Sequence, residues 1–186
     1  MSVTIPTITL SGQVASMARA TIDGTPNTGV TATESKSGQQ HVTKLTLSAL
    51  VVSAIAAAGA EAVGKLLYTF PAGAVLLRAA HLDLELTNTD GDIDADTPDI
   101  GLGTTIASGA NATLEAVGTG AENVLTGQTT DDCDGTATVK GVTDQALTIQ
   151  ANDDHTVYLN VADTWADDDT GLKATGTVTL EWVDLS

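Results

Sequence analysis

The chain has few basic residues. Seven Lys and Arg stand against 24 Asp and Glu among 186 residues, which gives a formal charge of -17 and a pI near 4.1. Proteins that bind nucleic acid neutralise phosphates with clustered Lys and Arg, and the sequence contains no such cluster. This scarcity argues against a nucleic-acid partner.

Cysteine, aromatic residues and long apolar runs are also scarce. The single cysteine, Cys133, excludes an intramolecular disulfide and argues against a cysteine-rich zinc site. Aromatic residues make up only 3 %, so the core must consist of Val, Leu, Ile and Ala. The longest nearly apolar run, residues 49–60, is shorter than the roughly 20 residues of a membrane helix, and the first residues do not resemble a secretory signal. We therefore expect no membrane partner and no export.

Known catalytic motifs are missing. His41, His81 and His155 have neither the i,i+4 spacing nor the adjacent Glu of a zinc hydrolase, and we interpret all three as surface residues. No Gly-x-Ser-x-Gly elbow is present, and the glycines of 101–103 lack the third glycine of a dinucleotide site. We therefore expect a protein that is not an enzyme, and we assign no catalytic or cofactor-binding residue.

Alternating apolar and polar residues predict strands over most of the chain. In 81–86 three leucines alternate with His, Asp and Glu, and 156–161 and 175–183 repeat this two-residue period. The 31 threonines suit pleated strands, and turn-forming clusters separate the runs. The Ala-rich stretch of residues 51–63 could form a short helix, but we favour a strand to about Ile55 followed by a loop. The pattern predicts an all-β, antiparallel, jelly-roll-like β-sandwich over residues 41–186, with Trp182 in its core.

Residues 1–40 differ from the rest of the chain. They are rich in Ser, Thr, Gly and Gln, and residues 35–40 are polar without a periodic apolar face, so we interpret 1–40 as an extended N-terminal arm. An ordinary N-terminal strand followed by a long loop is the alternative. Charge is also uneven, because residues 1–80 sum to +2 (five basic, three acidic) and residues 81–186 to -19 (two basic, 21 acidic). This split suits a chain whose first part meets a partner, and it makes Arg19, Lys36 and Lys44 candidate contacts.

Acidic runs offer the weak alternative of a calcium site. Carboxylate oxygens are the ligands that calcium prefers, and they are dense between residues 90 and 99, but the EF-hand pattern fails at its sixth and twelfth positions. Similar runs occur at 131–134, 153–154 and 167–169, and they would matter if these loops converged at one end of a sandwich. Neighbouring aspartates should raise the pKa of Cys133, and Trp165 is an open candidate for stacking on a sugar. The metal-ligand candidates are Asp90, Asp92, Asp94 and Asp96.

The residues also resemble a known family. Four segments are the basis of this resemblance: the run Lys-Leu-Leu-Tyr-Thr-Phe-Pro-Ala-Gly at 65–73, the Leu-Gly-Thr core of 100–105, the strand 157–161 and the closing strand 176–185. They are similar to segments of tailed-bacteriophage capsid decoration (cement) proteins. The resemblance covers about residues 43–186 and leaves the arm unaccounted for. Ala72 departs from it, since a glutamate is common at that position.

This resemblance implies a virion structural protein. It would be made in the host cytoplasm, form a jelly-roll trimer, bind the major capsid protein on the outer capsid surface and stabilise the shell. A tail, baseplate or fibre component is one alternative, and a carbohydrate- or calcium-binding β-sandwich module is another.

Overall fold

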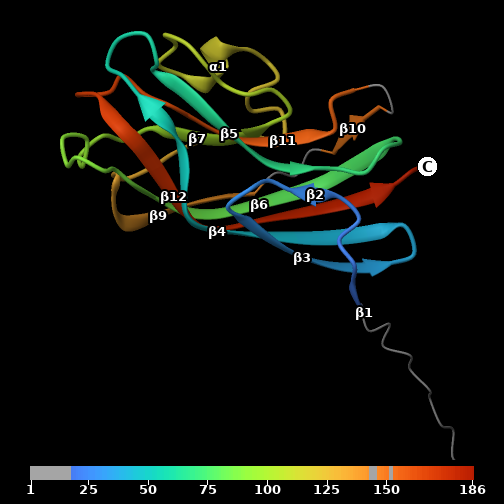
Figure 1. Ribbon diagram of the computed structural model, residues 1–186. Helices are drawn as coiled ribbons and strands as arrows, with labels where there is room; N and C mark the ends of the chain where they lie inside the picture. Colours follow the sequence, from blue (N-terminus) through green and yellow to red (C-terminus); the bar gives the residue numbers. More distant parts are fainter. Residues whose placement is uncertain (1–17, 143–145, 151–152) are drawn as a thin grey trace, which may run out of the picture.

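The computed structural model describes residues 18–142, 146–150 and 153–186, with the side chains of 18–20 and 136–139 left out. The described chain is all-β and forms two antiparallel sheets, one of seven strands and one of five, and one sheet is curled into a half-barrel. In Figure 1 the five-stranded sheet lies above the seven-stranded one. The seven-stranded sheet has the order β1-β3-β4-β12-β6-β10, with β9 also pairing with β6, and consists of β1 (Ala18–Ala20), β3 (Val30–Ser37), β4 (Gln40–Ile55), β6 (Val75–Thr87), β9 (Asp134–Val142), β10 (Leu147–Ile149) and β12 (Asp169–Asp184).

The second sheet has the order β2-β5-β11-β7-β8 and consists of β2 (Thr25–Pro26), β5 (Ala62–Thr69), β7 (Asp99–Gly103), β8 (Leu125–Thr129) and β11 (Thr156–Ala162). A single helical turn, α1 (Leu114–Val117), follows β7 on the far side of this sheet (Figure 1). None of the helical residues that the structure describes forms a segment long and apolar enough to span a membrane.

The hydrophobic core fills the space between the sheets. Leu82, Leu84 and Leu86 of β6 are buried and the residues between them are half-buried, which confirms the two-residue period expected of this strand. Trp182 is also buried, as predicted. The core is mainly aliphatic, as the composition requires, and three of the five Phe, Tyr and Trp residues are grouped together. Phe70 packs edge to face against Tyr68 and against Trp182, with ring centroids 5.3 Å and 5.4 Å apart.

The two longest strands, β4 and β12, share an irregularity near their middle. Their register shifts between Ala174 and Gly176, opposite Leu47 and Leu50. Ala49 has a positive φ of 49° and donates its backbone N–H to Thr175 Oγ1 at 3.1 Å. Gly176 has φ 137°, and a Cβ there would lie 2.2 Å from the carbonyl oxygen of Asp83. A bulge of this kind bends both strands and increases their twist.

Two expectations about element boundaries have different outcomes. β4 ends at Ile55, which confirms a strand rather than a helix there. The arm boundary at residue 40 is corrected, because β3 forms a regular hairpin with β4 across it and β1 and β2 also join the two sheets. Strand β3 is rich in hydroxyl groups, and only every second residue faces the core. The inward-facing residues therefore do not form an apolar pattern in the sequence that would predict a strand. The rest of the expected arm, residues 1–17, lies outside the described residues.

Candidate functional site

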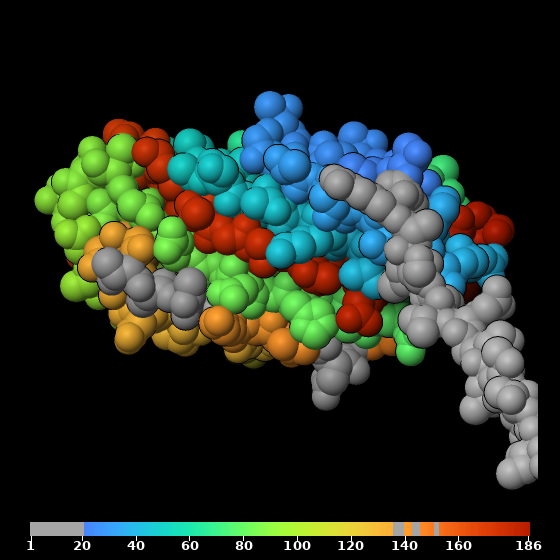
Figure 2. Space-filling view, turned by 90° about the horizontal axis from the view of Figure 1, so that it is seen from below, coloured from blue at the N-terminus to red at the C-terminus, as the bar shows by residue number. Residues whose placement is uncertain are grey.

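The outer face of the seven-stranded sheet is rich in hydroxyl groups. Along β4, Lys44 and Thr46 alternate with the buried Leu45 and Leu47 and so point away from the core. The register continues the row across the sheet, since Thr31 pairs with Thr46 and Thr46 with Thr177. Figure 2 looks onto this face and shows β3, β4, β12, β6 and β9 side by side, from blue and cyan through red and green to orange.

This face is almost neutral in a strongly acidic chain. Six of the seven Lys and Arg residues lie on strands of the seven-stranded sheet, and Lys65 of β5 is the other. Among described side chains, four cations and four carboxylates alternate with core residues and point outward, which leaves no net charge on the face and -17 on the rest of the chain. The outward charges are Lys44, Arg78, Lys140 and Lys173 against Asp83, Glu85, Asp134 and Glu181.

The three predicted contact residues lie close together in the sheet. Lys44 is exposed on β4, opposite Thr33 of β3. Lys36 is exposed near the end of β3, where its ammonium lies 3.0 Å from a carboxylate oxygen of Asp23. Arg19 pairs through its backbone with Ser35, and its side chain lies outside the described residues. These positions share one edge of the sheet, on β1, β3 and β4, and the role assigned to them stays a prediction.

A buried polar cluster lies beneath the same edge. Glu34 points from β3 into the protein and is only 1 % exposed. Its Oε2 accepts hydrogen bonds from Thr43 Oγ1 at 2.9 Å and from the Tyr68 hydroxyl at 3.3 Å, while Oε1 lies 2.9 Å from His41 Nδ1. Burial, and next the negative charge of Glu34, raise the pKa of Tyr68 well above its ordinary value, so its hydroxyl remains a donor.

His41 is part of this cluster, which corrects its interpretation as a surface residue. Its ring is 3 % exposed and stacks on Trp182, with 3.8 Å between ring centroids. His41 faces inward on β4, two residues before the inward-facing Thr43. Extending the two-residue period of β4 towards its N-terminus would have predicted this inward position. The other two histidines are partly exposed: His81 Nε2 lies 3.4 Å from Glu181 Oε1, and His155 contacts the Gly73 carbonyl oxygen at 2.6 Å.

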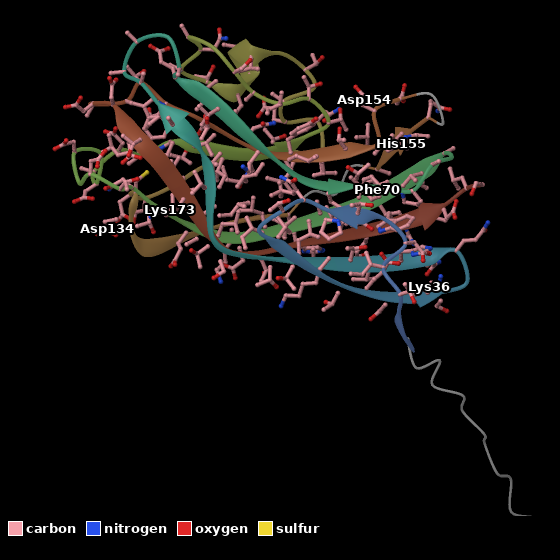
Figure 3. All side chains as sticks on the ribbon, viewed as in Figure 1. Lys36, Phe70, Asp134, Asp154, His155 and Lys173 are labelled. Atoms are coloured by element: carbon pink, nitrogen blue, oxygen red, sulfur yellow. The ribbon has the colours of Figure 1, made fainter. Side chains whose placement is uncertain are left out.

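The acidic loops gather at the opposite end of the sandwich. Asp96 accepts a hydrogen bond from the backbone N–H of Ala166 at 2.8 Å, and the Asp94 carbonyl accepts one from the N–H of Cys133 at 3.0 Å. Three of the runs noted in the sequence therefore meet: 90–99, 131–134 and 167–169. Figure 3 shows the labelled Asp134 and Lys173 at this end of the seven-stranded sheet and Lys36 at the other.

The four candidate calcium ligands remain dispersed within this end. Asp94 binds the amide of Asn88, and Asp90 accepts a 3.4 Å hydrogen bond from the N–H of Thr170, while Asp92 is exposed. None of the four belongs to a group of three metal-ligating atoms within 4.8 Å among the described residues. The calcium hypothesis for these residues stays a prediction, without a preformed ligand set behind it.

Two other residues at this end are buried. The Cys133 thiol is shielded from solvent, and burial, followed by the charges of Asp96 and Asp163, raises its pKa to about 12. The expected direction is confirmed, but burial contributes more than the aspartates. Trp165 is 3 % exposed and donates its indole N–H to the Glu61 carbonyl at 2.8 Å. Its ring faces are therefore not available to a sugar, which corrects the stacking hypothesis.

A surface hollow of about 390 Å³ lies between α1, β8 and the exposed Val142. Its ionisable lining consists of Glu115 and Glu122, and none of the three histidines borders it.

Comparisons with known proteins give no match: no protein family, no curated protein and no solved structure is significantly similar to this chain.

Proposed function

We propose that this chain is a virion structural protein that decorates the outside of a phage capsid and stabilises the shell. The observation that carries the proposal is the near-neutral, hydroxyl-rich outer face of the seven-stranded sheet, which stands out on a chain of charge -17. A capsid lattice is the partner that such a face fits, because the face offers many hydrogen-bonding groups and little net charge to repel an acidic neighbour.

The acidic remainder of the molecule has its own role in this arrangement. Copies crowded on a shell repel one another through the charge of -17 that lies off the docking face, which keeps them from aggregating and from binding nucleic acid. The interface lacks exposed aromatic anchors, so each copy binds weakly. Attachment as a trimer, with a jelly-roll sandwich in each protomer, would raise the overall affinity through several simultaneous contacts.

The test uses empty shells of the major capsid protein from the same phage, assembled without this protein. Lys44→Glu and Thr177→Glu place negative charge on the outer face, and Lys65→Glu is the matched control on the other sheet. We expect the two outer-face variants to cosediment with shells at least about tenfold more weakly, which corresponds to about 1.4 kcal/mol, and the control to bind as the wild type does. Binding should also weaken with salt, since exposed charges are screened.

Deletion of residues 1–17 tests the contribution of the N-terminal segment. A longer deletion to residue 40 would remove β3 from the sheet and so confound attachment with folding. We expect the shorter deletion to reduce shell attachment while the circular dichroism spectrum stays β-rich.

Shells with and without the protein are then compared for their melting temperature. Shells that melt at the same temperature in both states would remove the stabilising role. Binding to tails instead of shells would favour a tail or baseplate component, and binding on a glycan array would favour a carbohydrate-binding module.

A further inference from the structure

Three side chains of metal-ligating type converge beside the first strand of the seven-stranded sheet. Asp23 Oδ2, Glu34 Oε1 and His41 Nδ1 all lie within 4.8 Å of one another, and the structure holds no other such group among its described residues. We propose that Asp23, Glu34 and His41 form a binding site for one zinc ion. Attachment to a capsid is not needed for this inference.

The separations between the ligand atoms suit a tetrahedral ion. His41 Nδ1 lies 2.9 Å from Glu34 Oε1 and 3.8 Å from Asp23 Oδ2. Ligands at about 2.0–2.1 Å from zinc lie about 3.3 Å apart in a tetrahedron. The two distances bracket that value, and the carboxylate oxygens of Asp23 and Glu34 lie within 4.8 Å of each other. Shifts of up to about 1.5 Å would therefore complete the site, with a water molecule as fourth ligand.

Hydrogen bonding alone leaves this arrangement only partly satisfied. Nδ1 of an imidazole carries at most one hydrogen, and that hydrogen can be directed at one of the two carboxylates. A cation can be shared by both carboxylates and by the ring nitrogen at once. One imidazole with two carboxylates is also a mixed nitrogen and oxygen set, which zinc accepts.

The surrounding residues hold two of the ligands in position. Thr43 and Tyr68 both donate to the second oxygen of Glu34, which leaves Oε1 directed at His41. Trp182 stacks on the His41 ring and donates its indole N–H to Thr43 Oγ1 at 2.9 Å. Such outer contacts fix ligand orientation in metal sites and strengthen metal affinity.

The third ligand gives the ion a way in. Asp23 lies between β1 and β2, and its side chain is 32 % exposed, whereas Glu34 and His41 are buried. Lys36 occupies this entrance with its ammonium 3.0 Å from the same Asp23 oxygen that faces His41. The Lys36 side chain is 42 % exposed and can turn into solvent. The ammonium and the zinc ion therefore compete for Asp23.

A bound ion would tie the segment between β1 and β2 to the β3–β4 hairpin. Asp23 precedes β2 of the five-stranded sheet, while Glu34 and His41 belong to the seven-stranded sheet. The proposed role is therefore a structural clamp across the two sheets at the edge where the described chain begins.

The experiment is calorimetric titration of the metal-stripped full chain with zinc chloride at neutral pH. We expect one saturable site and a rise in melting temperature. Asp23→Asn should weaken zinc binding at least tenfold, and this variant keeps the fold because the residue is partly exposed. Lys36→Gln should tighten binding at least threefold, since it removes the competing ammonium. Cobalt should bind the same site and show the visible absorption of a tetrahedral ion.

His81→Gln is the matched control, because His81 also faces a carboxylate but only one, on the surface. It should leave zinc affinity unchanged. The proposal is overturned if zinc shows no saturable binding, if Asp23→Asn binds it as tightly as the wild type, or if Lys36→Gln fails to tighten binding. Loss of binding in His81→Gln would likewise overturn it.

Discussion

The two ends of the seven-stranded sheet each bury a carboxylate, and they satisfy it in different ways. At the hairpin end Glu34 accepts hydrogen bonds from side chains, those of Thr43 and Tyr68, and faces His41. At the other end Asp169, 2 % exposed, accepts from the backbone N–H groups of Thr89, Asp90 and Gly171 at 2.6–3.1 Å. Glu34 is held only by side chains that can rotate or change tautomer, whereas Asp169 is held mainly by fixed backbone N–H groups, with the Thr89 hydroxyl at 3.1 Å as its one rotatable donor.

The backbone donors around Asp169 determine the pKa of its carboxyl group. Burial by itself raises the pKa of the Asp169 carboxyl, but the hydrogen bonds from Thr89, Gly171 and Asp90 outweigh it and lower that pKa below its usual value. The ring of donors keeps Asp169 ionised among other acidic groups. A site of this kind is closed to a metal ion, since the oxygens are already occupied by fixed donors, whereas the hairpin end retains a ring nitrogen that can become a ligand.

The largest predicted effect concerns the reactivity of Cys133 at the acidic end. With a thiol pKa of about 12, the thiolate fraction near neutral pH is about a thousandfold below that of an ordinary cysteine. Alkylation by iodoacetamide should therefore be at least a thousandfold slower in the folded chain, as measured by mass spectrometry. Ser108→Cys adds an exposed thiol as an internal control. Equal labelling of both thiols in the native protein would contradict the buried position.

The next prediction compares the loss of stability when each of the two buried carboxylates, Asp169 and Glu34, is replaced by its amide. In Asp169→Asn the new amide N–H groups must face backbone N–H donors that cannot turn away, so we expect a loss of about 2–3 kcal/mol in unfolding free energy. In Glu34→Gln the new amide can donate to His41 once the ring changes tautomer, so we expect a loss of about 1 kcal/mol.

Urea denaturation of both variants in the presence of EDTA makes this measurement. Asp92→Asn, in an exposed loop position, is the control and should change stability by less than about 0.5 kcal/mol. A larger loss for Glu34→Gln than for Asp169→Asn would reverse the comparison.

The smallest predicted effect is a pH dependence. Because the pKa of Asp169 is lower in the folded than in the unfolded chain, its ionised form stabilises the fold above the unfolded pKa of about 3.9, and this contribution disappears as pH falls through the folded pKa. The stability difference between wild type and Asp169→Asn should therefore be largest at neutral pH and shrink at acidic pH. Urea titrations at several pH values measure it, and a constant difference would show that the hydrogen bonds do not favour the ionised form.

Much of the framework was predictable from local pattern. The alternation in 81–86 and 175–183 places leucines and Trp182 in the core because successive strand residues point to opposite faces. Strand β3 escaped prediction because its inward positions are Val, Ala and the charged Glu34, which do not form an apolar face in the sequence. His41 escaped for a related reason, since its partners Glu34, Asp23 and Trp182 lie on three other segments.

Strand period and composition are local properties, so they suffice to predict an all-β chain with an aliphatic core and a strong negative charge. The folded arrangement adds that cations and threonines share one sheet face, that three acidic runs meet at one end, and that Asp23, Glu34 and His41 converge. Those outcomes depend on which strands pair and in which register, and pairing joins residues as far apart as His41 and Trp182. Register is set by the fit of the whole core, which no short segment encodes.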